Sequence, residues 1–138
     1  MIDQDTVYQY LSKQRLAVIS SVSESGSPES ALIGVGVTPG LEIVFDTLDS
    51  SRKYKNIIQN PNVSLVIGWD NEISVQYEGI ATLLTDADEY YKEVYYDAYP
   101  DGRERALTWR GLVQFKVSPK WIRYSNFNEP VVIEEITF

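Results

Sequence analysis

A strand pattern passes into a helix pattern at Val44-Phe45-Asp46-Thr47-Leu48-Asp49-Ser50-Ser51-Arg52-Lys53, in a chain of formal net charge −8. The group Arg52-Lys53-Tyr54-Lys55, here called the basic island, is flanked on each side by 36 residues without a Lys or Arg. Cations at a helix N-terminus oppose the helix macrodipole, so the island needs a further explanation. Exposed backbone N–H groups and cations at one helix start are suited to a phosphate or a similar anion.

Two interpretations of the island follow from its charge pattern. In the first, the Ser50 and Ser51 hydroxyls, the first helical N–H groups, and the Arg52 and Lys53 side chains surround an anion. In the second, Arg52 pairs with Asp49 or Asp46, and the lysines are solvated helix charges. Surface pairs of that kind contribute about 0–1 kcal/mol. The charge pattern alone leaves both interpretations open.

Composition limits the class of protein. The 138 residues predict one domain, 1–138. No apolar run reaches the roughly 18 residues of a membrane span, and the acidic N-terminus is unlike a signal peptide, so we expect a cytoplasmic protein without membrane contact. The acidic balance, with a pI of about 4.5, argues against nucleic acid as a partner.

The chain contains no His and no Cys, and this absence limits its chemistry. It removes the usual general base and the commonest ligands of transition metals, so we expect no metal site. If the protein is an enzyme, a bound cofactor supplies the reactive group.

Hydrophobic periodicity predicts three helices and seven or eight strands. A helix with Val7, Tyr10 and Leu11 on one face is expected first, a second begins at Ser50 or Ser51 and ends at Asn60-Pro61, and a third follows residues 85–89 and extends to about Tyr99. The expected strands are residues 16–22, 31–37, 41–45, 63–69, 73–84, 111–117, 121–125 and 131–136. The first three, joined by short polar turns, suggest an antiparallel meander. The pattern predicts an α+β barrel-like domain.

Two further features have competing explanations. Gly34 and Gly36 lie inside an expected strand, which indicates either a barrel corner or the close approach of a flat ligand, with the corner favoured. Arg103, Arg105 and Arg110 form a second basic group, for which a solvated loop is the favoured explanation over an interface or a second anion contact.

The segment 44–53, followed by Asn60-Pro61-Asn62-Val63 and a strand that leads to Trp69, resembles the FMN-binding split-barrel family typified by pyridoxamine 5'-phosphate oxidase. The resemblance extends over roughly residues 16–125. It implies an antiparallel split β-barrel of six to eight strands with about three flanking helices. It also implies a homodimer with FMN in the groove between the subunits.

The resemblance assigns cofactor-binding roles along the chain. Arg52 and Lys53 would bind the FMN phosphate, with help from Thr47 and Ser51. The strand backbone along the isoalloxazine ring would be formed by Ala31, Ile33, Gly34, Val35 and Gly36. Ser74 stands where the family has a flavin-contacting Gln, and Gln76 is a substitute two residues later.

Three departures from the family pattern concern the substrate. Asp46 replaces a Tyr and places a carboxylate near the ligand, and Ser125 replaces a flavin-contacting Trp. The C-terminal Arg-Leu-His-Asp-Arg element of the oxidase has no counterpart in residues 126–130. The resemblance therefore implies a different substrate, with no side-chain catalyst assigned.

The leading hypothesis is an FMN-dependent oxidoreductase that uses a small-molecule substrate or a nicotinamide reductant. The alternatives are a non-catalytic flavin-binding or storage protein, a deazaflavin-dependent reductase, and a structural dimer that binds only inorganic anions. Haem is disfavoured because the chain has no His or Cys for an axial bond, which leaves Tyr.

Overall fold

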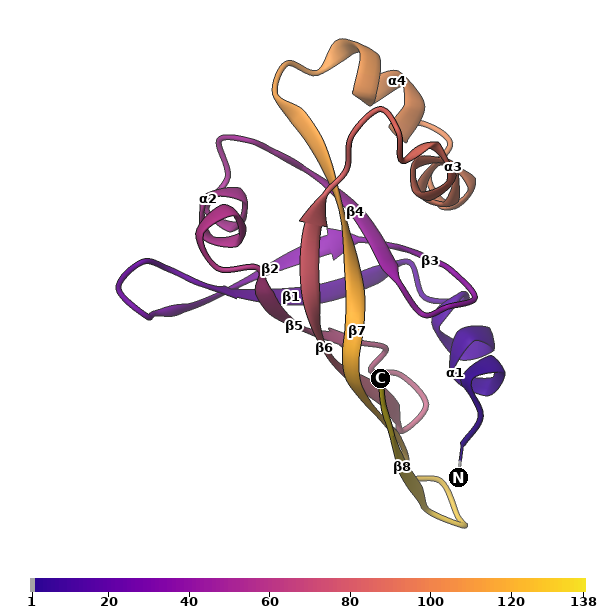
Figure 1. Ribbon diagram of the computed structural model, residues 1–138. Helices are drawn as coiled ribbons and strands as arrows, with labels where there is room; N and C mark the ends of the chain where they lie inside the picture. Colours follow the sequence, from indigo (N-terminus) through magenta and orange to yellow (C-terminus); the bar gives the residue numbers. More distant parts are fainter. Residues whose placement is uncertain (1) are drawn as a thin grey trace.

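A computed structural model describes residues 2–138 of the chain, so Met1 lies outside the described part (Figure 1). The helices are α1 (Gln4–Leu11), α2 (Arg52–Gln59), α3 (Glu89–Ala98) and α4 (Gly102–Thr108). The strands are β1 (Leu16–Val22), β2 (Pro28–Gly34), β3 (Gly36–Val37), β4 (Ile43–Leu48), β5 (Asn62–Ile67), β6 (Ile73–Leu83), β7 (Leu112–Asn126) and β8 (Val132–Thr137). No helix within residues 2–138 has the length and apolar character needed to cross a membrane.

The strands form one antiparallel sheet in the order β2-β1-β5-β6-β7-β4-β3, and β8 pairs with β7. The sheet curls around its buried face, as Figure 1 shows. The architecture is an α+β split barrel, which confirms the predicted fold class.

The expected meander is wrong in one respect, because its middle strand is divided at Val35. The first part, β2, pairs with β1, whereas the second part, β3, pairs with β4 at the other end of the sheet. Val35 is buried, and its N–H donates to the Arg15 carbonyl at 3.0 Å. A single bent segment therefore connects both ends of the curled sheet and closes the barrel. This bend confirms the favoured interpretation of Gly34 and Gly36 as a barrel corner.

The C-terminal strands also differ from the expectation. Segments 111–117 and 121–125 were expected as two strands separated near Pro119, but β7 runs through both. The register against β6 shifts where Glu78 pairs with Trp121 and Gly79 with Pro119, so Lys120 has no partner on β6. A bulge accommodates the proline, which has no N–H to donate, without ending the strand.

Helix α4 is a correction, because its residues were expected to form a solvated loop. Together α3 and α4 form a layer at one end of the barrel, over the outer surface of β4 and β7 (Figure 1). Under this layer a small second core contains Val44, Leu84 and Tyr95. Because this layer covers the outer surface of β4, side chains on that surface, such as Asp46, are mostly shielded from solvent.

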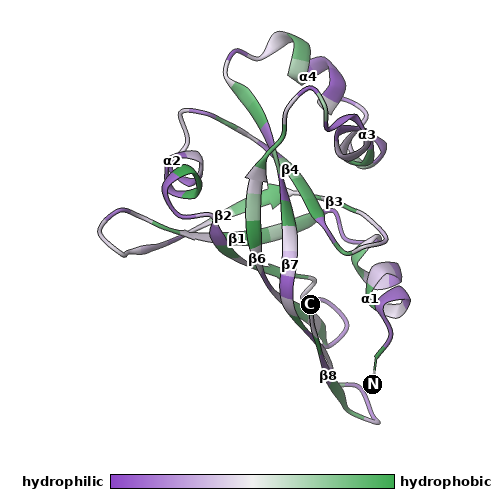
Figure 2. Cartoon of the chain, viewed as in Figure 1, coloured by the Kyte–Doolittle hydropathy of each residue, from purple (hydrophilic) through white to green (hydrophobic). Residues whose placement is uncertain are grey.

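The main core fills the barrel with apolar side chains from most of the strands. In Figure 2 the hydrophobic residues colour parts of these strands green. The Phe45 and Phe115 rings stack with centroids 5.5 Å apart. Val7 and Leu11 of α1 are fully buried against the same core. The buried Tyr77 hydroxyl lies 2.7 Å from the Leu41 carbonyl and 3.0 Å from that of Val117, and burial raises the pKa of this phenol.

The contact between Gly36 and α3 can be tested by Gly36→Ala. A Cβ at this position would lie 3.0 Å from the Val94 carbonyl oxygen and 3.2 Å from the Tyr95 Cα, so the helix backbone must move. We expect a loss of about 1–3 kcal/mol in the free energy of unfolding, measured by urea titration. Gly40→Ala is the matched control because its Cβ would meet nothing nearer than 3.4 Å. Equal stability of the two variants would contradict the proposed role of this contact.

Candidate functional site

The basic island begins α2, and hydrogen bonds hold this helix start to the end of β4. Ser51 is the N-cap residue, and its Oγ accepts a hydrogen bond from the Tyr54 N–H at 3.2 Å. The Thr47 hydroxyl lies 3.0 Å from the same Oγ. The N–H groups of Arg52 and Lys53 belong to the first turn and have no partner within the helix. The local structure thus presents two backbone donors beside two cationic side chains.

Arg52 pairs with a residue that the sequence did not indicate. Its guanidinium donates to Glu29 Oε2 at 3.2 Å, rather than to Asp46 or Asp49 as the second interpretation expected. The Asn56 amide donates to the other Glu29 oxygen at 2.8 Å and to the Ser21 hydroxyl at 3.0 Å. The Arg52 side chain is 73% exposed, so water screens this ion pair.

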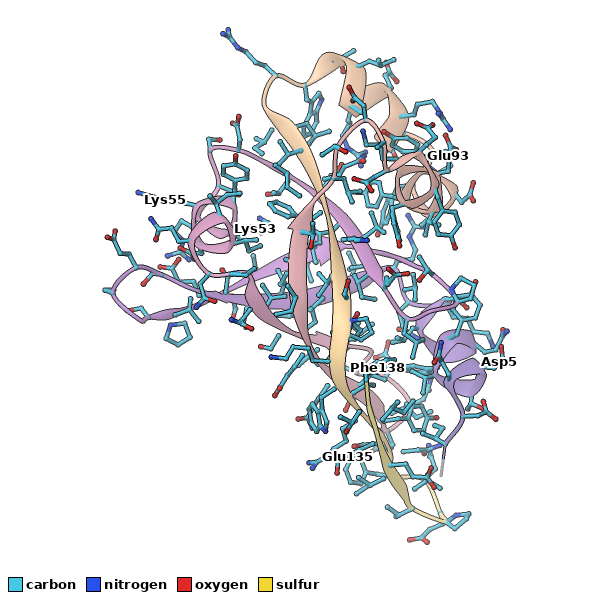
Figure 3. All side chains as sticks on the ribbon, viewed as in Figure 1. Asp5, Lys53, Lys55, Glu93, Glu135 and Phe138 are labelled. Atoms are coloured by element: carbon cyan, nitrogen blue, oxygen red, sulfur yellow. The ribbon has the colours of Figure 1, made fainter. Side chains whose placement is uncertain are left out.

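Lys53 lies closer to the sheet than the other cations of the island. Figure 3 shows it on the side of α2 that faces the barrel, with Lys55 on the opposite side. Burial lowers the pKa of Lys53, and the negative charge of Asp46 opposes this effect. Within residues 2–138 its Nζ forms no hydrogen bond or ion pair. A half-buried ammonium group without a direct counter-ion is suited to an anionic ligand.

A pocket of about 110 Å³ lies beside these cations. Arg52 and Lys53 line it from α2, and Glu29, Ser30 and Ala31 line it from β2. Its size matches a phosphate group rather than a whole nucleotide, because a water molecule in the liquid already takes about 30 Å³. The structure therefore brings Ala31, Arg52 and Lys53 together around one small polar cavity.

Asp46 is held by the helical layer. Its carboxylate lies 3.3 Å from the Arg105 guanidinium of α4, and these side chains are 15% and 19% exposed. Arg105 also donates to Asp101 at 2.7 Å and to the Tyr95 hydroxyl at 3.2 Å. Partial burial opposes the charged form of Arg105, but Asp46, Tyr95 and Asp101 outweigh it and raise its pKa. For Tyr95, in contrast, burial is the main cause of a raised pKa.

The remaining predicted residues of the bent strand lie away from the Lys53 pocket, and Val35 and Gly36 line a separate pocket beside α1 and α3. Ile33 and Val35 are part of the barrel core. A Cβ on Gly34 would lie 2.7 Å from the Tyr99 ring, and one on Gly36 would meet the α3 backbone. Packing of α3 and of the Tyr99 ring that follows it therefore explains both glycines, because protein rather than a flat ligand occupies the space into which a Cβ would point.

Ser74 and Gln76 lie on β6, away from the island. Two strands, β1 and β5, separate β6 from β2 in the sheet, which corresponds to about 14 Å at the usual strand spacing. Gln76 is exposed on the outer surface, opposite Val66 of β5. One copy of the chain does not bring these two side chains to the Lys53 pocket.

Sequence reasoning missed Glu29 and Asn56, and for Arg105 it favoured a solvated loop rather than the ion pair with Asp46. A signal for the first existed, because Glu29 alternates with Ala31 and Ile33 and so shares their inward-facing side. Asn56 stands one helical turn after Arg52, on the same face of α2. The contact between Arg105 and Asp46 joins residues 59 positions apart and has no local signal.

The Asp46 pair can be tested by Arg105→Met. Asp46 would keep its partly buried charge without a counter-ion, so we expect the free energy of unfolding to fall by about 1–3 kcal/mol in urea titrations. Arg103→Met in the same helix is the control, because Arg103 pairs with Glu93 in a more exposed position and should contribute under about 1 kcal/mol. Equal losses in the two variants would show that Arg105 has no special role in the layer.

Comparisons with known proteins identify a family for the sequence and solved structures with the same fold. Residues 4–126 match the sequence profile described as pyridoxamine 5'-phosphate oxidase. No protein of curated function shows a significant match to the sequence.

Solved structures share the fold at low sequence identity. A haem-binding protein from Mycobacterium smegmatis has a TM-score of 0.81 at 13% identity, over 99% of this chain and 59% of that one. General Stress Protein 26 from Bacillus anthracis has a TM-score of 0.75 at 20% identity, over 98% of both chains. A pyridoxamine 5'-phosphate oxidase-related, FMN-binding protein from Nostoc punctiforme has a TM-score of 0.69 at 12% identity, over 100% of this chain and 97% of that one. Since the profile match spans nearly the whole sequence, the chain belongs to the pyridoxamine 5'-phosphate oxidase family.

Proposed function

We propose that the protein binds FMN and acts as an oxidoreductase on a substrate other than pyridoxamine phosphate. The observation that supports this most directly is Lys53, a half-buried cation that has no ion-pair partner among residues 2–138 and lies beside a phosphate-sized pocket. Family membership and the FMN-binding relative from Nostoc punctiforme point to the same cofactor.

The phosphate end of FMN fits the residues present. The Lys53 ammonium and the first N–H groups of α2 would bind phosphate oxygens, and Arg52 would join them by turning from Glu29. Glu29 lines the pocket and opposes this binding by its charge, but the hydrogen bond that its Oε1 accepts from the Asn56 amide holds its carboxylate toward α2. When bound, FMN would supply the redox chemistry, and these residues would fix its position.

The isoalloxazine ring needs a different surface, because α3 covers Gly34 and Gly36. We propose that the ring lies in the groove between two copies of the chain. Ser30 and Ala31 line the phosphate pocket, and the next residue, Leu32, is exposed on the outer sheet surface. The phosphate pocket thus borders an outer surface that a second subunit would cover.

That outer surface is apolar across three neighbouring strands. Leu32 of β2 is in register with Val18 of β1, which is in register with Val66 of β5. Leu32, Val66 and Leu16 are all exposed. We propose that this surface, with Leu32 at its edge, is the dimer interface.

The cofactor assignment can be tested with purified protein. Denaturation should release FMN, identified by its absorbance and fluorescence, or the apoprotein should take up added FMN. Arg52→Ala/Lys53→Ala should weaken FMN affinity by about 100-fold or more, because two charge-assisted contacts to the phosphate are lost. Lys13→Ala/Arg110→Ala removes the same charge from exposed positions and should leave FMN affinity unchanged.

Other spectra would support the alternatives. A Soret band in place of the flavin spectrum would favour haem, the ligand named for the mycobacterial relative. A deazaflavin spectrum would refute FMN as the cofactor. So would a protein that inorganic phosphate stabilises against unfolding but that does not bind FMN. If FMN is bound but neither NADH nor NADPH bleaches its absorbance, a flavin-storage role is favoured over a nicotinamide-dependent reductase.

The dimer can be tested by Leu32→Glu/Val66→Lys. Charges within the apolar surface should convert the dimer to a monomer in size-exclusion chromatography with light scattering. Leu107→Glu is the control, because Leu107 on α4 is 84% exposed but lies outside the proposed interface. A monomeric wild-type protein, or a dimer that persists in the double variant, would refute the interface.

A further inference from the structure

A second pocket, of about 210 Å³, lies between the α3–α4 layer and the strands β6 and β7. None of the residues of the basic island lines it. One side is apolar and is formed by Leu83, Leu84, Ala106 and Leu112. The polar lining comes from Lys92, Tyr96 and Gln114, which the proposed flavin site does not use.

Gln114 is the least satisfied of these polar residues. Its side chain is on β7, opposite Asp46, and the residue is only 6% exposed. Its Nε2 donates to the Tyr96 hydroxyl at 3.2 Å, whereas its Oε1 is buried with no hydrogen-bond partner among residues 2–138. Exchanging the two ends of the amide would leave one of its atoms unpartnered in either case. Buried polar atoms without a partner are rare in folded proteins, so the Gln114 Oε1 indicates a missing hydrogen-bonding group.

Lys92 provides a cation in the same pocket. Its side chain is 22% exposed, so most of it is covered by protein. Its ion pair is with Asp86, at 3.8 Å, and that carboxylate is fully exposed to water. Such a long, solvated pair is weak and is easily exchanged for a carboxylate that enters the pocket.

From this arrangement we propose that the pocket binds a small carboxylic acid with an apolar ring and a hydrogen-bond donor. The carboxylate would pair with Lys92, and the ring would lie against Leu84 and Leu112. The Gln114 Oε1 is covered in this structure, so its amide would turn toward the pocket to accept the ligand's donor. The volume is below the roughly 300–1,000 Å³ of pockets for larger ligands, which limits the ligand to about one ring. This site is independent of the flavin proposal, because it shares no residue with the Lys53 pocket.

Titration of the full-length, isotope-labelled protein with 4-hydroxybenzoate tests the proposal. In ¹⁵N–¹H spectra the shifted amide signals should cluster at Leu84, Tyr96, Ala106 and Leu112. Two related probes separate the contacts: benzoate lacks the donor, and 4-hydroxybenzyl alcohol lacks the carboxylate. Both should bind about tenfold more weakly than 4-hydroxybenzoate.

Three variants assign the contacts to residues. Lys92→Met should weaken 4-hydroxybenzoate about tenfold but leave 4-hydroxybenzyl alcohol unaffected. Gln114→Leu should remove the advantage of 4-hydroxybenzoate over benzoate, a selective change that a purely structural role would not produce. Ala106→Phe fills the pocket from the exposed side of α4, without entering the core, and should abolish binding of all three probes. Lys13→Met is the charge control and should bind like the wild type.

The outcomes are decisive in both directions. Shifts confined to the pocket, together with the selective losses in the three variants, would support the site. The absence of shifts at millimolar probe, shifts scattered over the surface, or unchanged affinity in Lys92→Met and Ala106→Phe would each overturn it. FMN binding by wild-type protein has no influence on either result.

Discussion

The structure depends on the bend at Val35, where one extended segment leaves β1 and joins β4. Because β2 and β3 occupy opposite ends of the strand order, this segment connects the two ends of the sheet and closes the barrel. The Val35 side chain enters the core, and its N–H bonds to the Arg15 carbonyl. Gly36 then lets α3 approach the backbone of the bend closely.

Closure of the barrel also determines which surfaces are available for function. The α3–α4 layer covers the outer side of β4 and β7, so Asp46 faces Arg105 rather than solvent. In the described part of the chain, no such layer covers the outer side of β2, β1 and β5, where Leu16, Leu32 and Val66 are exposed. The basic island lies beside this uncovered region, since Arg52 and Lys53 share a pocket with Ser30 and Ala31 of β2. A ligand held at the island would therefore extend toward the uncovered side of the sheet.

The electrostatics of the island are more balanced than its sequence suggests. Arg52 is neutralised by Glu29, and the field of Asp46 reaches Lys53. Lys55 is exposed to water, so Lys53 is the lysine of the island for which burial makes the charged form costly without an anion. Helix α2 begins with two cations and no acidic residue in its first turn, which costs stability through the macrodipole. Both costs decrease when an anion binds, which is the physical basis of the proposed phosphate site.

The sequence by itself determined the elements with strong periodicity or clear end signals: the Ser51 cap of α2, the tyrosine-rich helix α3, and the alternating strands that predict an α+β barrel. It also determined the resemblance that led to the family, because the residues from Thr47 to Asn60-Pro61 are local in the chain. Only the tertiary structure decided that residues 31–37 divide at Val35, that Arg103 and Arg105 belong to a helix, and that Pro119 sits inside one long strand. Only it revealed the partners Glu29 for Arg52 and Arg105 for Asp46, and the Gln114 Oε1 that has no partner within residues 2–138. The physical reason is that helix caps and side-chain alternation depend on neighbouring residues, whereas barrel closure, ion pairing and hydrogen-bond satisfaction depend on contacts between distant segments.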